Sequence, residues 1–200
     1  MIEGAVQLNR FGLERGKLLP AILVLLAVFA PAVLWTQWNN SVDGELPVPD
    51  GTVYRLEAAP NPGAAGHGGV TFTVPGPGWV TDRGANKSNS VILVAGSIVV
   101  RVQAVAGVSD LKLLFDRQSR DLRVASRVMF TTGSHEYTSP GGLPGFWGDL
   151  TGDRYGGALV VVGHDGAAAV LTAAAPLGSV ESQMDDITRI LAGLEVRGGE

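Results

Sequence analysis

The hydropathy pattern divides the chain into an apolar N-terminal segment and a longer part of mixed character. Residues 18–35 (LLPAILVLLAVFAPAVLW) contain no charged side chain. At a rise of about 1.5 Å per residue, a helix of this length spans roughly 27 Å, close to the hydrocarbon thickness of a bilayer. Trp35 and Trp38 follow at its end, where indole rings favour the membrane interface. The pattern predicts a transmembrane helix over residues 18–38, which contacts the lipid bilayer.

The flanking charges predict the orientation of this helix. All Lys and Arg residues before it lie in residues 10–17, and none follows before Arg55. Positively charged flanks stay in the cytoplasm, so residues 1–17 are predicted to be cytoplasmic, and the chain beyond a single plasma-membrane pass to lie outside. Ala30-Pro31-Ala32 also fits the small-x-small pattern of a signal-peptidase site. A secreted protein with a cleaved signal peptide is therefore the alternative.

Beyond a polar tether over residues 39–50, the pattern changes to alternation of apolar and polar residues. Residues 70–74 (VTFTV) place one Phe and two Val side chains on one face and two Thr side chains on the other, as in a half-buried strand. His164-Asp165-Gly166 separates two apolar runs, as a tight hairpin turn does. Further strands are expected at residues 51–57, 91–95, 97–105, 126–132, 136–138, 155–163 and 167–175. Loops rich in Gly, Pro or polar residues are expected at residues 58–69, 75–78, 82–89 and 139–146.

Two segments carry apolar residues at helical spacing. In residues 110–122 Leu and Phe recur every three or four positions among charged residues, and Ser109 precedes them as a candidate N-cap. Residues 180–194 show the same spacing after Ser179. This order of strands, helix, hairpins and helix favours an antiparallel sheet with about two helices packed on it. The sequence thus predicts one extracytoplasmic α+β domain over residues 51–200.

Composition and charge narrow the classes of function. The part beyond residue 38 carries 12 Lys and Arg against 17 Asp and Glu, a net charge of -5. No basic surface for nucleic acid is expected from this balance. The chain has no cysteine, which excludes disulfides, thiolate metal ligands and cysteine nucleophiles. An exported domain without cysteine, rich in Gly and Ala, fits the envelope of a bacterium with a GC-rich genome.

The candidate chemical motifs fail when their spacing is examined. The three histidines are far apart and show no metal-binding or catalytic spacing. The oxygen-rich segment 149–153 does not fit a calcium loop, because Arg154 and Val160 stand where Gly and Glu are required. Asp185 and Asp186 point about 100° apart on the predicted last helix, which is typical of a solvated face. We therefore expect no enzyme activity, no cofactor and no metal site.

Aromatic and basic residues are the candidate contacts with a partner. Trp79 follows a Pro-Gly-Pro-Gly loop, and Phe146 and Trp147 follow a second loop of Gly and Pro. Aromatic residues in such places either cap the core or form a contact surface for a partner. Arg117 and Arg120 belong to the predicted middle helix. Its basic face is either solvated or meets an acidic partner or anionic headgroups.

The segment VTFTVPGPGW, residues 70–79, resembles the strand, Val-Pro, turn and Gly-Trp opening of the Mog1/PsbP-like fold, which includes actinobacterial LpqN-like envelope proteins. The order of elements over residues 51–196 is similar as well. The resemblance implies a binding or accessory subunit of a larger assembly, with no catalytic residues to carry over. Together with the anchor, it implies an accessory protein that associates with or stabilises a membrane protein complex of a bacterial, specifically actinobacterial, envelope. The alternative is an envelope protein that binds a lipid or small hydrophobic ligand in a pocket between layers.

Overall fold

A computed structural model of the chain describes residues 44–58, 68–82, 84–126, 129–164 and 166–198. The predicted transmembrane helix over residues 18–38 lies outside these ranges, as do the predicted cytoplasmic segment 1–17 and the Ala30-Pro31-Ala32 sequence. Within the described ranges, no helix is both long and apolar enough to cross a membrane. The chain separates into two compact units, Met1–Gly44 and Glu45–Glu200, and the described strands and helices belong to the second.

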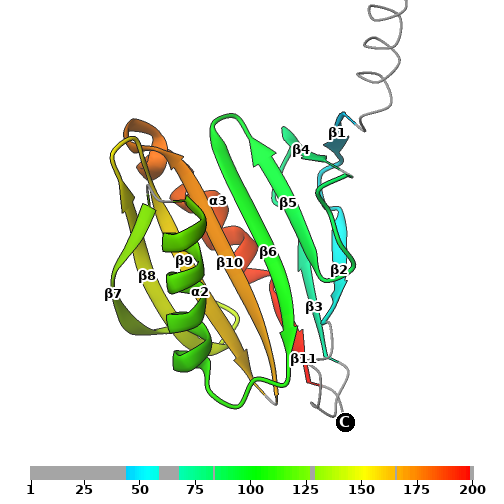
Figure 1. Cartoon of the computed structure of the whole chain (residues 1–200). Helices are drawn as coiled ribbons and strands as arrows, with labels where there is room; N and C mark the ends of the chain where they lie inside the picture. The colour runs from blue at the N-terminus through cyan, green and yellow to red at the C-terminus, as the bar shows by residue number, and fades with distance from the viewer. Residues whose placement is uncertain (1–43, 59–67, 83, 127–128, 165, 199–200) are drawn as a thin grey trace, which may run out of the picture. The chain divides into compact units, whose positions relative to one another are not determined.

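An eight-stranded sheet forms the centre of the second unit, and its neighbouring strands are all antiparallel (Figure 1). Its strands are β1 Glu45–Val48, β4 Trp79–Asp82, β5 Ser90–Ala95, β6 Ile98–Ala106, β7 Met129–Thr138, β8 Pro144–Gly152, β9 Tyr155–His164 and β10 Ala167–Pro176. Their order across the sheet is β1-β4-β5-β6-β10-β9-β8-β7. Strands β7 to β10 run as consecutive hairpins that return from the far edge and bring β10 against β6.

One face of this sheet, the back face, is covered by a second layer. This layer contains a three-stranded sheet in the order β11-β3-β2, and helix α3 after the 3-10 turn η2. Its elements are β2 Val53–Glu57, β3 Gly69–Thr73, β11 Glu195–Arg197, η2 Leu177–Ser179 and α3 Val180–Ala192. Phe72, Leu93, Leu171 and Ile190 are each at most 1% exposed in the cluster between the layers. Alternation along β5 and β10 and helical spacing along α3 thus place their apolar faces in one core.

Helix α2, Leu111–Ser126, covers part of the opposite face, the front face. Its Phe115 is 2% exposed and packs against Leu159 and Val161 of β9. Figure 1 shows α2 in front of β7, β8 and β9, while β5 and β6 carry no described helix on this face. The helix begins one residue later than the N-cap prediction implied, because Asp110 and not Ser109 accepts the hydrogen bond of the Leu113 amide, at 3.0 Å. Asp is among the residues that cap helices best.

The predicted α+β class, an antiparallel sheet with two helices, is confirmed for the described residues, but the predicted tether over residues 39–50 is wrong in its second half. Glu45–Val48 form β1, which pairs with β4. Val48 is 6% exposed and belongs to the core. Pro47 is tolerated because β1 is an edge strand, where a missing N–H breaks no ladder. The domain therefore starts at residue 45 and not at residue 51.

The segment from residue 144 to 152 also differs from its prediction. Its Gly and Pro content favours a loop up to residue 146, whereas the segment forms strand β8 between β7 and β9. A Cβ at Gly148 would lie 2.7 Å from the Phe115 ring. Gly148 is therefore required by the close approach of α2 to the sheet and not by a turn. The two short strands predicted over 126–138 are one strand, β7, with a register shift between Thr132 and His135.

Candidate functional site

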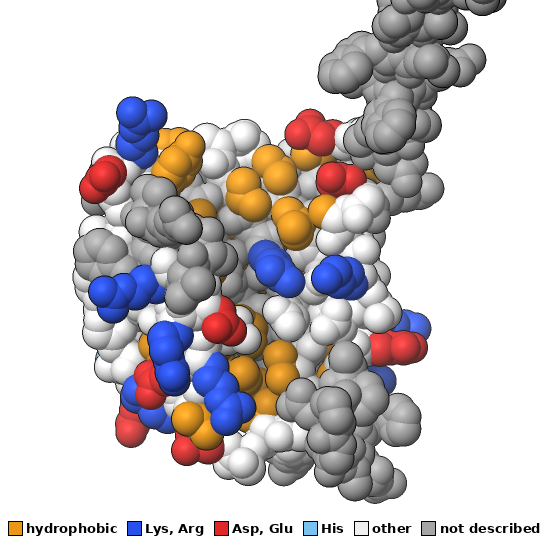
Figure 2. All heavy atoms as spheres, viewed as in Figure 1, with side chains coloured by type: hydrophobic (Ala, Val, Ile, Leu, Met, Phe, Trp, Pro, Cys, Tyr) orange, Lys and Arg blue, Asp and Glu red, His pale blue; other side chains and the backbone are white. Residues whose placement is uncertain are grey.

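The uncovered half of the front face carries a continuous apolar row. The strand register pairs Val80 with Val94, Val94 with Val99, and Val99 with Ala174. Neighbouring strands lie about 4.8 Å apart, so these side chains form one surface across β4, β5, β6 and β10. Val99 is 43% exposed, and the other three are partly exposed. We call these four residues the valine row. Figure 2 shows apolar side chains gathered over this part of the face, with basic side chains directly below them.

Next to the valine row, the following cross-strand neighbours on this face have a polar side chain on the middle strand, β6. Arg101 of β6 lies between Ile92 of β5 and Thr172 of β10. Gln103 follows two residues later, opposite Val170. The back-face residues of β6 include Val100, Val102 and Ala104, each at most 1% exposed. A central strand that is apolar on one face and carries Arg and Gln on the other presents that second face to water or to a partner.

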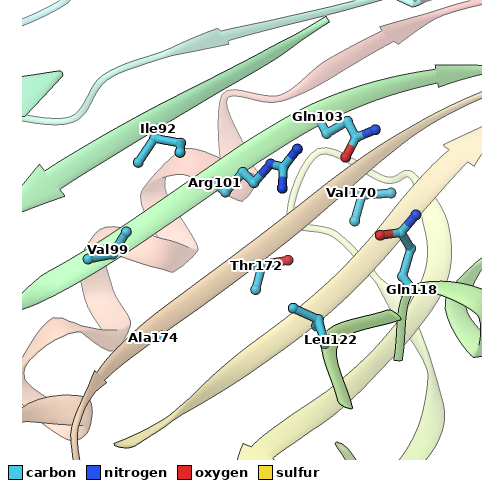
Figure 3. A pocket seen from close by; sticks show the side chains of 9 residues that line it. All are labelled: Ile92, Val99, Arg101, Gln103, Gln118, Leu122, Val170, Thr172 and Ala174. Atoms are coloured by element: carbon cyan, nitrogen blue, oxygen red, sulfur yellow. The ribbon is translucent and has the colours of Figure 1, made fainter. Parts of the chain in front are cut away.

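Helix α2 forms the second wall of a groove over these rows. Gln118 and Leu122, one helical turn apart, line it together with side chains of β5, β6 and β10 (Figure 3). Its volume is about 200 Å³. Its lining residues are Ile92, Val99, Arg101, Gln103, Gln118, Leu122, Val170, Thr172 and Ala174. We call this site the α2 groove.

Three polar side chains in the α2 groove have unused hydrogen-bonding capacity. Arg101 is exposed, and Gln103 and Gln118 are half-buried. Within the described part of the chain, none of the three side chains forms an ion pair or a hydrogen bond. A guanidinium offers five N–H donors that match a carboxylate, and each amide offers two donors and an acceptor. The groove is therefore equipped to bind a polar or anionic group beside an apolar surface.

The predicted contacts Arg117 and Arg120 are both exposed on α2. Successive residues of a helix turn by about 100°. Relative to Phe115, which packs on the sheet, Arg117 and Arg120 are each turned by about 140–160° around the helix axis. Both therefore point away from the sheet, and neither lines the α2 groove.

Trp79 is a core residue in this structure. Its side chain is 2% exposed, and its Nε1 donates a hydrogen bond to the Pro75 carbonyl at 2.9 Å. The intervening Gly76 and Gly78 have φ angles of 73° and 93°, which favour glycine. The Val-Pro-Gly-Pro-Gly-Trp segment thus folds back on itself and fixes the indole over the back-face core. Of the two interpretations of Trp79, core capping is the one that its burial supports.

Phe146 and Trp147 are neighbours on β8 and therefore point to opposite faces of the sheet. Phe146 lies on the front face, 6.4 Å from the Phe115 ring, and the Lys112 ammonium stands 5.9 Å from its centroid. Trp147 packs on the back face, 5.4 Å from the Tyr137 ring. Strand β8 is five strands from β4 in the sheet, about 24 Å at normal spacing. The three predicted aromatic residues consequently do not form one surface.

A second depression lies beside Phe146, where β7 and β8 meet the start of α2. Its volume is about 280 Å³, and its lining includes Leu111, Glu136, Tyr137 and Pro144. Enclosed sites for small ligands usually exceed about 300 Å³. Both this depression and the α2 groove of about 200 Å³ are smaller than that. Their size suits single side chains of a partner better than a whole lipid.

Burial raises the pKa of Tyr137. A tyrosine in an unfolded chain ionises near pH 10, about its ordinary value. Above that pH the unfolded state loses its proton first, so the contribution of Tyr137 to stability is present below pH about 10 and is lost as pH rises through the raised pKa. We expect a titration of tyrosinate absorbance to show a late step that Tyr137→Phe removes. A late step that persists in Tyr137→Phe would contradict this assignment.

Among the described residues, no histidine lines either depression. His135 on β7 and His164 at the end of β9 are both exposed. In the described ranges, no group of three or more His, Cys, Asp or Glu residues is placed to hold a metal ion. The polar lining of the α2 groove consists of Arg, Gln and Thr, which bind by hydrogen bonds and do not exchange protons near neutral pH.

Sequence reasoning missed Arg101 and Gln103, the central polar residues of the α2 groove. The sequence predicts a strand over residues 97–105, mostly apolar, and assigns no role to its polar side chains. The signal was present in its alternation, since Val99, Arg101 and Gln103 share one face of a strand whose other face is wholly apolar. This alternation could not identify a binding surface by itself, because the sequence does not reveal that β6 is a central strand or that α2 covers a different part of the sheet.

The domain is thus an α+β protein with a large antiparallel sheet, which carries a second layer on one face and helix α2 on part of the other. No protein-family model matches its sequence, and no curated protein matches it. The structure is similar to the solution structure of cyanobacterial PsbP (CyanoP) from Synechocystis, with 12% identity, coverage of 74% of this chain and 95% of that chain, and a TM-score of 0.49.

Two further solved structures show the same likeness. The Ran-binding protein Mog1p of Saccharomyces cerevisiae has 12% identity, coverage of 72% of this chain and 95% of that chain, and a TM-score of 0.47. LpqN of Mycobacterium tuberculosis, involved in cell envelope biogenesis, has 15% identity, coverage of 77% and 91%, and a TM-score of 0.35. The chain is thus similar in structure to a PsbP, a Mog1 and an LpqN protein, and such a likeness by itself carries no function.

Proposed function

We propose that this protein is a membrane-anchored, extracytoplasmic accessory protein that binds a membrane protein complex of a bacterial, specifically actinobacterial, envelope, and that it is not an enzyme. The observation that carries the proposal is the α2 groove. Arg101, Gln103 and Gln118 have no side-chain partner within the described residues, and the valine row beside them exposes apolar surface. An exposed apolar patch bordered by polar side chains is typical of a surface that binds another protein.

The anchor is the second part of the proposal. If residues 18–38 cross the membrane, the six residues 39–44 connect them to β1, which starts at Glu45. A chain of this length reaches at most about 21 Å. Tethering at so short a range raises the effective concentration of the domain near complexes in the same membrane, so that weak contacts suffice.

The alternative, a binding protein for a lipid or small hydrophobic ligand, has less support. Phe72, Leu93 and Leu171 between the layers are at most 1% exposed, so these side chains fill the space that a ligand would need. The two depressions described above are shallow and partly polar.

Affinity purification of the full chain from membranes in mild detergent tests the binding role. We expect a membrane protein to co-purify with the wild type and to decrease at least tenfold with Arg101→Glu. Arg55→Glu is the matched control, since it makes the same charge change on exposed β2, away from the front face. Recovery of the chain alone in every fraction, or equal recovery of the partner with both variants, would overturn the proposal.

Alkaline extraction of the same membranes tests the anchor. We expect the full chain to stay in the pellet with its N-terminal segment intact. A soluble protein whose first residue follows Ala32 would instead establish the cleaved signal peptide.

A further inference from the structure

We infer that the α2 groove binds an amphipathic α-helix of a partner protein, lying beside α2 and carrying an Asp or Glu that pairs with Arg101. This inference rests on the proposed function and names the chemistry of the partner.

The space on the front face has the width of one helix. Helix α2 packs on β7, β8 and β9 and covers part of β10, whereas no described helix or strand packs on β6 and β5 on this face (Figure 1). From β5 to β10 there are two strand spacings, about 10 Å in all. A helix has a diameter of about 10–12 Å, and packed helices lie about 8–10 Å apart. A second helix beside α2 therefore fills the uncovered half without displacing the first.

The backbone of the groove floor favours a helix over an extended peptide. Strand β6 is hydrogen-bonded to β5 on one side and to β10 on the other. Its N–H and C=O groups are thus used within the sheet, and an extended segment laid on this face would find no backbone partners. A helix satisfies its own backbone and needs only side-chain contacts.

The lining matches one face of such a helix. Val99, Arg101 and Gln103 recur every two residues along β6, about 6.8 Å apart. Residues i and i+4 of a helix are separated by about 6 Å along its axis. A helix running along β6 therefore sets apolar residues against Val99, a carboxylate against Arg101, and a polar residue between Gln103 and Gln118.

Charge complementarity selects the acidic partner. Arg101 lies at the centre of the groove with no ion pair among the described residues. The chain beyond residue 38 has a net charge of -5, which repels an anionic bilayer surface and a second copy of the same domain. A single arginine in an acidic domain recognises one carboxylate at short range, where the pair is partly desolvated.

Photo-crosslinking in membranes tests this inference. A benzoylphenylalanine is introduced at position 118 of the full chain, and the same residue at position 53 on β2 serves as control, because Val53 is 51% exposed. We expect the probe at position 118 to capture one partner segment that has apolar residues at i, i+3, i+4 and i+7 and an Asp or Glu among them. Position 53 should not capture it.

A charge exchange completes the test. Arg101→Glu is expected to lower the crosslink yield at least tenfold, and replacement of the captured Asp or Glu by Arg in the partner should restore at least half of it. Capture of a neutral or extended segment, of lipid, or of a second copy of this chain would overturn the inference. If co-purification still depends on Arg101 in that case, the proposed accessory role stands and only the acidic helix is wrong.

Discussion

Gly145→Ala should destabilise the domain by about 3 kcal/mol or more. A Cβ on Gly145 would lie 1.9 Å from the carbonyl oxygen of Val161 and 2.8 Å from the Val162 Cα. Both atoms belong to the backbone of β9, which is buried between β8 and β10. The methyl group can be accommodated only if β8 separates from β9. Because a domain of this kind has a net stability of about 5–15 kcal/mol, the loss is a large part of the total.

Urea denaturation measures this effect, with Gly178→Ala as the matched control. No atom lies within 4 Å of the position that a Cβ would take on Gly178, so we expect a change within about 0.5 kcal/mol. Equal midpoints for Gly145→Ala and the wild type would show that β8 does not approach β9 as closely as in this structure. The folded fraction of Gly145→Ala is determined first by circular dichroism, since loss of folding is itself the expected direction.

Trp79→Ala should cost about 3–5 kcal/mol of stability, the usual range for removing a buried aromatic side chain. The indole is 2% exposed in the back-face core, and its Nε1 bonds to the Pro75 carbonyl. Trp79→Phe keeps most of the apolar volume and loses that hydrogen bond, so its expected cost is about 1–2 kcal/mol. Thermal or urea unfolding of the two variants measures the difference.

Val53→Ala is the control for Trp79, because Val53 is 51% exposed on β2 and its truncation should change stability by no more than about 0.5 kcal/mol. If Trp79→Ala were as neutral as this control, Trp79 would not be a core residue, and its role as a partner contact would have to be considered again. If the variant is destabilised as expected, partner binding after refolding in stabilising conditions should be unchanged.

Much of the local structure followed from the sequence. The β-branched, strongly apolar runs over residues 91–95 and 97–105 predicted β5 and β6 within a residue or two, and helical spacing predicted α2 and α3. These signals are local, because a strand or helix at a surface must have an apolar side every second residue or every three to four residues. The Trp79 segment was informative for the same reason, since its glycines, proline and indole interact within five residues.

The predictions from the sequence are wrong where contacts with residues far away in the chain determine the conformation. The β1 strand of residues 45–48 has too few residues for a periodic signal and exists because β4 pairs with it. Strand β8 resembles a loop in composition, but Gly145 and Gly148 are required by the backbone of β9 and the ring of Phe115. Glycine has two uses, a turn and a close approach, and only the neighbours in space distinguish them.

The two parts of the proposed function, the anchor and the α2 groove, likewise depend on different information. The sequence by itself determined the α+β class of the domain, the alternation of its main strands, and an uncharged segment over residues 18–38 whose role as an anchor stays a prediction. Only the tertiary structure decided that Trp79 is buried, that Phe146 and Trp147 are on opposite faces, and that Arg101 lies in an open groove beside α2. The physical reason is that periodicity records which side of an element is apolar, whereas strand order and helix placement determine which of those sides another element covers.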